Sequence, residues 1–189
     1  EYYRTNVMGT GFLLDWIATL PQLHTIIAAS SAAIYGDPAK HHHHSKHSIR
    51  PVQEDRVLPE PLSPYASSKL EMEQALDNFA INHPHIATIA LRFFNVYGPR
   101  QAEDSDYSGV ISKFIASALT NQDLMIFGSG QNTRDFVHVE DLSRAVYLLS
   151  LGGFNHTNAL LAMNLGSQTS TTIQTLAETV ISFVPQSTS

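Results

Sequence analysis

Tyr65 and Lys69 stand four residues apart in the stretch YASSKLEMEQALDNFAINH, whose apolar pattern is that of a helix. Residues at this spacing share one helix face and lie about 6 Å apart along the axis. An ammonium beside a phenol favours the phenolate, which can act as a base near neutral pH. A bare tyrosine and lysine at this spacing are more often two ordinary residues of an amphipathic helix, so the pair needs support from the rest of the chain.

The stretch after Tyr65 is predicted to be one helix that ends near His83 and Pro84. Its apolar residues would face a core, and they are Leu70, Met72, Ala75, Leu76 and Phe79. Its other face would meet solvent through Glu71, Glu73, Gln74 and Asp77. Such a helix would hold Tyr65 and Lys69 on a rigid support.

A pair of serines precedes this helix, in HTIIAASSAAIYG. Residues 24–29 predict a buried strand, and Ser30 and Ser31 follow in the turn at its carboxyl end. In an open α/β sheet, that end of a strand is where ligands bind. Because a serine hydroxyl can donate a hydrogen bond to a substrate oxygen, Ser31 is a candidate site residue.

The remaining hydrophobic patterns predict further helices and strands. A first helix is expected over residues 1–20 and should end at Pro21. The residues of this helix expected to face a core are Val7, Phe12, Leu13, Trp16, Ile17 and Leu20. Strands are expected at 86–93, 124–127, 133–139 and 159–166, and helices at 109–119, 140–151 and 173–183, the last with Ser/Thr caps. This alternation predicts an α/β fold, a parallel sheet with helices on both faces.

Composition excludes several classes of protein. The 189 residues, 43% of them hydrophobic, suffice for one domain of ordinary size. The net charge of −6 and the lack of a Lys/Arg patch argue against a nucleic-acid partner. No apolar run approaches the ~18 residues of a membrane helix, so no membrane partner is expected. The absence of cysteine excludes disulfides and favours a cytoplasmic location.

A long loop is predicted between residues 37 and 64, and it contains the tract His41–His44. Adjacent histidines can bind a transition metal loosely. The tract lacks the cysteines and the regular spacing of a structural zinc site. We therefore expect residues 39–48 to be a mobile, dispensable insertion and expect no metal site.

Four motifs in order, SSAAIYG after a strand, PYASSK, LRFFNVYGPR and TRDFVHVEDL, resemble the extended short-chain dehydrogenase/reductase family. Within it the chain is similar to the NAD-dependent epimerase/dehydratase group, above all to the sugar-nucleotide epimerases typified by UDP-glucose 4-epimerase. The similarity runs from Asn6 to about Glu178. It implies a Rossmann-like doubly wound sheet with part of a smaller mixed α/β substrate lobe. Residues 1–100 would be the later half of the NAD-binding domain, 101–138 a segment of the substrate lobe, and 139–189 the return to the sheet with a closing helix.

The resemblance also implies the site. The catalytic residues would be Ser31, Tyr65 and Lys69. The NAD-binding residues would be Asn6, Ser30, Tyr65, Lys69 and Phe94. The substrate-binding residues would be Ser31, Asn95, Phe127 and Arg134. Ordinary structural roles remain open for four positions: Asn6 as a surface residue, Phe127 as a core residue, Arg134 in a pair with Asp135 or Asp141, and His138 as a structural side chain.

The implied reaction is a reversible oxidation of the sugar 4-hydroxyl. Tyr65 would take the proton, Ser31 would share the hydrogen bond, and Lys69 would stabilise the phenolate and contact the nicotinamide ribose. The substrate would be a nucleotide sugar, a UDP-sugar by resemblance. In the family the helices that carry Asn6 and Tyr65 commonly pair, which implies a homodimer.

The residues after Ser31 bear on which reaction of the family this chain could perform. Sugar-nucleotide 4,6-dehydratases carry an Asp-Glu pair where this chain has Ala32 and Ala33, so the acid and base for expelling water are missing. A nucleotide-activated heptose 6-epimerase fits SSAAIYG and FFNVYGPR equally well. A non-catalytic relic or binding module is the alternative from another class.

No GxxGxxG or GxGxxG turn follows a strand anywhere in the sequence. That turn cradles the cofactor pyrophosphate in dinucleotide-binding folds. We therefore expect this chain to be the later part of a longer fold, and residues 1–189 alone to bind NAD weakly or not at all.

Overall fold

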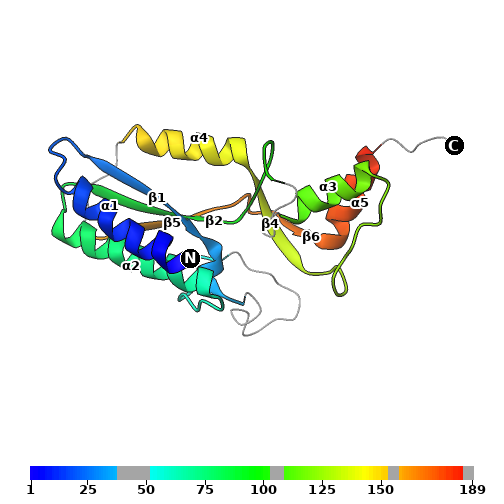
Figure 1. Ribbon diagram of the computed structural model, residues 1–189, viewed down its shortest axis with the longest axis horizontal. Coiled ribbons are helices and arrows are strands. Elements are labelled where there is room, and N and C mark those ends of the chain that lie inside the picture. Colours follow the sequence, from blue (N-terminus) through cyan, green and yellow to red (C-terminus); the bar gives the residue numbers. More distant parts are fainter. Residues whose placement is uncertain (38–51, 103–108, 153–157, 185–189) are drawn as a thin grey trace. The chain divides into compact units, whose positions relative to one another are not determined.

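The computed structural model describes residues 1–37, 52–102, 109–152 and 158–184 (Figure 1). The predicted insertion at 39–48 lies outside the described residues. The chain forms two compact units. Unit 1 comprises Glu1–Phe94 and Arg144–Leu165, and unit 2 comprises Asn95–Ser143 and Gly166–Ser189.

Unit 1 is built on a parallel sheet of three strands in the order β1-β2-β5. The strands are β1 (Thr25–Ser31), β2 (Ala87–Phe93) and β5 (Leu161–Leu165). In the central strand β2, every residue but the last is buried, as a parallel strand between two neighbours requires. The predicted parallel sheet is confirmed, and β1 extends further than expected, to include Ser30 and Ser31.

The helices of unit 1 begin with η1 (Tyr3–Met8), a π-helical segment that continues into α1 (Gly9–Ile17). The longest helix is α2 (Pro64–Asn82), and the short helix η2 (Ala32–Tyr35) follows β1. The start of α2 is marked by Ser63, whose hydroxyl accepts from the Ala66 amide at 3.1 Å, and by Pro64 at the first turn. Helices α1 and α2 lie together on one side of the sheet, and α4 (Val139–Ser150) runs along the other (Figure 1).

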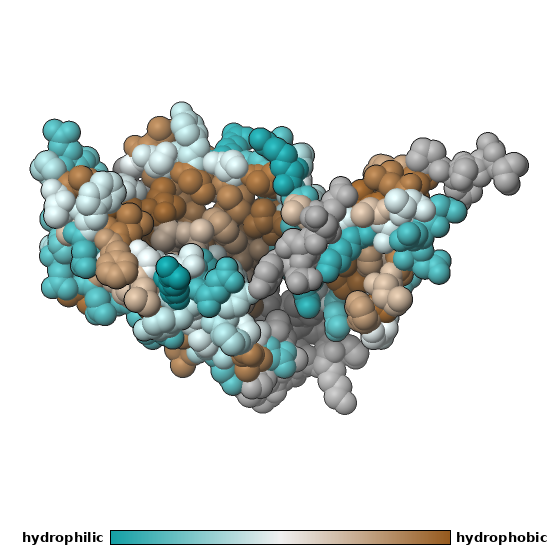
Figure 2. Space-filling model, viewed as in Figure 1, coloured by the Kyte–Doolittle hydropathy of each residue, from teal (hydrophilic) through white to brown (hydrophobic). Residues whose placement is uncertain are grey.

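The core of unit 1 lies between α1, α2 and the sheet, and its buried residues are Leu14, Ile17, Met72, Leu76, Phe79 and Ile86. The expected core face of the first helix was wrong in most positions. Phe12, Leu13 and Trp16 are exposed by 69%, 53% and 60%. The apolar side chains of α1 lie on several sides of the helix, but α2 covers only the side that carries Leu14 and Ile17. Figure 2 shows further hydrophobic surface over unit 1, between α1 and α4.

Unit 2 contains a second sheet in the order β3-β4-β6. Its strands are β3 (Asn95–Tyr97), β4 (Thr133–His138) and β6 (Ser170–Thr172), and β6 is antiparallel to β4. Helices α3 (Val110–Leu119) and α5 (Ile173–Phe183) pack together through Phe114, Leu176, Ala177 and Val180. The Thr172 hydroxyl accepts from the Thr175 amide and caps α5, as predicted.

Two expectations for this part of the chain differ from the structure. The strand predicted at 124–127 is absent, and these residues form a loop. The segment 139–189 does not return as a whole to the first sheet, because β6 pairs with β4 and α5 packs on α3. Within this segment, only Arg144–Leu165 belongs to unit 1.

None of the helices in the described ranges has both the length and the apolar character that crossing a membrane requires.

Candidate active site

The first turns of α2 hold Tyr65 and Lys69 beside one another. The Lys69 Nζ atom lies 5.9 Å from the centroid of the Tyr65 ring. The same ammonium donates a hydrogen bond to the main-chain oxygen of Ala29 at 2.9 Å, which ties α2 to β1. Burial lowers the pKa of Lys69. The predicted pairing of a phenol with a cation is therefore present in the fold.

The ring of Tyr65 is half-buried and packs edge-on against Tyr2, with centroids 5.4 Å apart and planes at 65°. Within the described part of the chain, no residue hydrogen-bonds its hydroxyl. A phenol that is held at its ring but has an unused hydroxyl can exchange a proton with a ligand.

The end of β1 gives its two serines different surroundings. Ser31 is the cap of η2, and its hydroxyl oxygen accepts from the Ala33 amide at 3.2 Å. This bond uses a lone pair and leaves the hydroxyl proton for another acceptor. Ser30 is buried and donates its proton to the Glu73 carboxylate at 2.5 Å. Successive residues of a strand point to opposite faces, which accounts for the difference.

Asn6 is joined to α2 and is not an isolated surface residue. Its amide nitrogen donates to the Ser68 hydroxyl at 3.0 Å, and that hydroxyl donates to the main-chain oxygen of Tyr65 at 2.7 Å. Asn6 lies in the π-helical segment η1, an irregularity that is frequent at functional sites. The predicted site residues Asn6, Tyr65 and Lys69 thus meet at one end of α2.

Phe94 and Asn95 stand where the chain passes from unit 1 to unit 2. The amide of Phe94 donates to the Leu165 oxygen at 3.1 Å, which extends the pairing of β2 with β5. The Asn95 side chain donates to the main-chain oxygen of Asp135 at 3.0 Å and secures β3 to β4.

Arg134 is exposed on β4, and its guanidinium donates to the Thr133 oxygen at 2.8 Å. The alternative pairing with Asp135 or Asp141 is not seen in the described residues. The Asp135 carboxylate instead accepts from the amide and hydroxyl of Ser167, both at 2.7 Å, and from the Gln168 amide at 2.9 Å. The Arg134 guanidinium therefore retains donors for a ligand.

Two aromatic residues of unit 2 differ in burial. Phe127 is 85% exposed, so its interpretation as a core residue is wrong. His138 is half-buried and packs against the Tyr97 ring, with centroids 5.2 Å apart. Its Nδ1 atom also lies 3.3 Å from the Glu140 amide.

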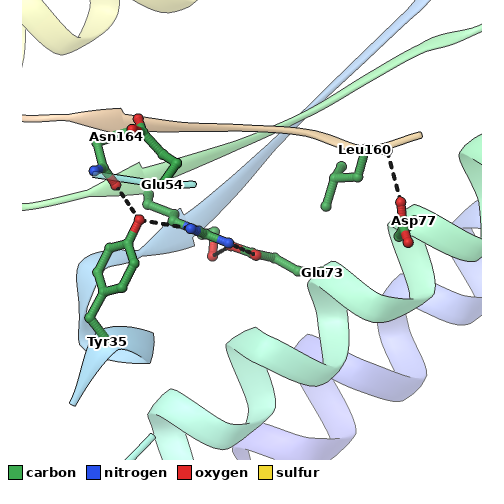
Figure 3. Close-up of polar contacts among 8 residues, drawn as sticks. Tyr35, Glu54, Glu73, Asp77, Leu160 and Asn164 are labelled. Atoms are coloured by element: carbon green, nitrogen blue, oxygen red, sulfur yellow. Dashed lines mark hydrogen bonds and ion pairs between the residues drawn. The ribbon is translucent and has the colours of Figure 1, made fainter. Parts of the chain in front are cut away.

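Sequence reasoning missed a buried polar group in unit 1. Glu73, assigned above to the solvent face of its helix, is 4% exposed and forms an ion pair with Arg92 at 2.7 Å. Tyr35 and Asn164 join this pair (Figure 3). One signal was available, because Arg92 ends the apolar run IATIAL and a buried arginine requires an acid.

The chain is similar to known proteins over nearly its whole length. Residues 1–158 match the family described as "NAD dependent epimerase/dehydratase family". The chain is 32% identical over 180 residues to a UDP-glucose 4-epimerase of Erwinia amylovora, and this match covers 88% of the chain and 50% of that protein.

Solved structures agree. A UDP-glucose 4-epimerase of Thermotoga maritima with UDP-glucose matches at a TM-score of 0.79 and 31% identity, over 94% of this chain and 52% of that one. A UDP-glucuronic acid 4-epimerase of Bacillus cereus in complex with UDP-glucuronic acid and NAD matches at a TM-score of 0.76 and 31% identity, over 93% of this chain and 50% of that one. The chain spans about half the length of these relatives.

Proposed function

We propose, on the premise that this chain belongs to the NAD dependent epimerase/dehydratase family, that it carries the catalytic residues of an NAD-dependent nucleotide-sugar epimerase. The observation that carries this proposal is the pair on α2: an ammonium 5.9 Å from a phenol ring whose hydroxyl has no partner in the described residues. Unit 1 would belong to the cofactor domain and unit 2 to the substrate lobe.

The residues of unit 1 fit the nicotinamide end of NAD. Lys69 has three donors and spends one on Ala29, so two remain for ribose hydroxyls. Asn6, Phe94 and Tyr65 are the further residues that would hold the cofactor. The expected role of Ser30 in this is not supported, because its side chain is buried and its hydroxyl is bound to Glu73. When bound, NAD supplies the hydride acceptor and donor of the reaction.

Tyr65 is the proposed base, which takes the proton from the sugar 4-hydroxyl and returns it after the sugar has turned over. Ser31 would donate its available proton to the same sugar oxygen. Lys69 would stabilise the phenolate through its charge, since an opposite charge within a few ångström favours the ionised form.

A UDP-sugar is the proposed substrate. The relatives named above were solved with UDP-glucose and UDP-glucuronic acid. Arg134 would bind the diphosphate, because a guanidinium pairs with phosphate in a two-pronged geometry. Asn95 would contact the same group, and the exposed ring of Phe127 would pack against the base.

The decisive experiment is Tyr65→Phe in the whole protein that carries this chain, assayed with UDP-glucose. Turnover should be abolished while calorimetric binding of the nucleotide sugar is nearly unchanged, because the lost oxygen acts in the transition state. Tyr147→Phe, at an exposed tyrosine, is the matched control.

Retention of even about a tenth of the turnover would show that Tyr65 is not the base. The similarity to the epimerases would then be one of fold alone, and a non-catalytic relic or binding module would become the better interpretation. If the unaltered protein were inactive on UDP-sugars but active on a nucleotide-activated heptose, the proposed proton and hydride transfer would stand and the proposed substrate would be wrong. In an active protein, Lys69→Met should move the pH optimum upward, because the phenolate loses its cation.

A homodimer and a cytoplasmic location complete the proposal. The exposed apolar residues of α1, Phe12, Leu13 and Trp16, support an interface through α1 and α2. Trp16→Glu should shift the sedimentation of the protein toward the monomer, and an unchanged dimer would contradict this interface. The lack of cysteine supports the cytoplasmic location.

A further inference from the structure

A row of polar side chains crosses the sheet of unit 1. Ser30, Arg92 and Asn164 are register partners on β1, β2 and β5. Partners in register on neighbouring strands point to the same face, so the three side chains form a line. Ser30 and Arg92 are 3% and 7% exposed. A charge at such burial needs compensation from outside the sheet.

Glu73 of α2 supplies the opposite charge. Its two carboxylate oxygens accept from the Arg92 guanidinium, at 3.1 Å from Nε and 2.7 Å from Nη2. The oxygen that accepts from Nε also accepts from the Ser30 hydroxyl. The carboxylate is thereby bound by two strands at once.

The row continues to η2 and to the segment before α2. Arg92 Nη1 donates to the Tyr35 hydroxyl at 2.7 Å, and this hydroxyl donates to Asn164 at 2.8 Å (Figure 3). Asn164 in turn donates to the Val52 oxygen at 2.9 Å, and its main-chain amide donates to Glu54. Six segments of unit 1, namely β1, β2, β5, α2, η2 and the segment before α2, therefore meet at this group of polar side chains.

The protonation states agree with these contacts. Burial raises the pKa of Tyr35, so the phenol keeps its proton and can donate it to Asn164. Burial opposes the charge of Arg92, but its bonds with Glu73 and Tyr35 together raise its pKa. A buried ion pair contributes little net stability compared with apolar residues of similar volume, and a benefit known for some such pairs is that they fix geometry.

The geometry that it fixes includes the candidate active site. Glu73 follows Lys69 by one helical turn and Tyr65 by two, so all three lie along one side of α2. Its partner Ser30 directly precedes Ser31, and the second tie between these segments is the bond from Lys69 to Ala29.

We propose that Glu73, held by Arg92, is a positioning residue that fixes Tyr65 and Lys69 relative to Ser31. This inference rests on the proposed function. The pair touches neither the sugar nor the cofactor in this proposal, and it acts only by holding α2 against the ends of β1 and β2.

The test compares E73Q with the double variant E73Q/R92Q in the whole protein. E73Q leaves a buried guanidinium uncompensated and should lower both the melting temperature and kcat. The double variant removes both charges, so most of the melting temperature should return. Its kcat should nevertheless stay about tenfold to hundredfold below the unaltered protein, with KM within about twofold, because misplaced groups slow chemistry without weakening binding. Should E73Q fail to fold, the double variant carries the test alone.

Asp77→Asn is the matched control. Asp77 lies one turn beyond Glu73 on α2 and accepts from the Leu160 amide at 2.9 Å (Figure 3). The Asp77→Asn variant should have the same kcat as the unaltered protein. Amide hydrogen exchange gives a readout without activity: residues 65–69 should exchange faster in the double variant and not in Asp77→Asn.

The kcat and the hydrogen exchange of the double variant decide whether the positioning role stands. A double variant with unaltered kcat and unaltered exchange would make the pair a purely structural element and overturn the inference. Tyr65→Phe, run in parallel, separates this from failure of the proposed function: if Tyr65→Phe abolishes turnover and E73Q/R92Q does not lower kcat, only the positioning role is wrong.

Discussion

In unit 1 the side chains of Glu73 and Arg92 are only 5% and 8% exposed, and each forms several hydrogen bonds. In unit 2, by contrast, Arg134 and Phe127 are exposed at the surface. Unit 1 thus buries the pair proposed to position its catalytic residues, whereas unit 2 exposes residues proposed to bind the ligand. In our proposal the buried pair holds the groups that do chemistry in place, which is what preorganisation requires. Groups proposed to bind a ligand are left open, since binding itself will cover them.

Each unit also has an acid that joins segments distant in the sequence. Glu73 joins α2 to two strands in unit 1, and Asp135 joins β4 to residues 167 and 168 in unit 2. The first acid pairs with a cation, whereas the donors to the second among the described residues are neutral. The loss of either should therefore have different consequences, and the following predictions run from the largest expected effect on folding to the smallest.

Arg92→Met should lower the free energy of unfolding by about 3–5 kcal/mol, because the Glu73 charge would remain buried without a partner. Urea denaturation measures the loss. Adding Glu73→Gln to this variant should recover a large part of it. A single variant that loses less than about 1 kcal/mol would show that water reaches the pair, and would weaken the contrast between the two units.

Asp135→Ala should lower the free energy of unfolding by about 1–3 kcal/mol, since the Ser167 and Gln168 amides lose a charged acceptor. Asp123→Ala, which changes an exposed loop acid of unit 2, is the control and should stay within about 0.5 kcal/mol. Equal effects of the two variants would show that Asp135 does not hold this loop together in solution.

Arg134→Ala should change the free energy of unfolding by less than about 0.5 kcal/mol, as is usual for an exposed side chain. In an active protein it should raise KM for the nucleotide sugar and leave kcat nearly unchanged, because a diphosphate contact exists in both ground and transition states. Arg144→Ala, at another exposed arginine, should change neither. A loss of stability as large as that of Arg92→Met would erase the distinction between the units.

Lys69→Met should alter how stability depends on pH. The pKa of folded Lys69 is lowered by burial, so the unfolded chain holds more protons between that pKa and the ordinary value of 10.5. Stability of the unaltered protein should therefore rise with pH across this interval, relative to Lys69→Met. Parallel urea series between about pH 8 and 10.5 check this, and a constant difference between the two proteins would contradict it.

The long elements were predictable because their signals are local. Helix α5 carries its cap and its apolar spacing within residues 172–183, and β2 reads as a buried run. The strands β3 and β6 were missed because three residues carry no periodicity, and each exists only because β4 lies beside it. Residues 124–127 show the converse, an apolar run that finds no partner strand.

For the candidate site, the sequence by itself determined which residue types could act together: a phenol and an ammonium one helical turn apart, and a serine at the end of a strand. It could not determine which faces are covered. Glu73 has the composition of a solvent-facing residue, and only the register of β1, β2 and β5 brings Arg92 and Ser30 beneath it. Burial is a property of what packs against a side chain, and those partners stand 19 and 43 residues away in the chain.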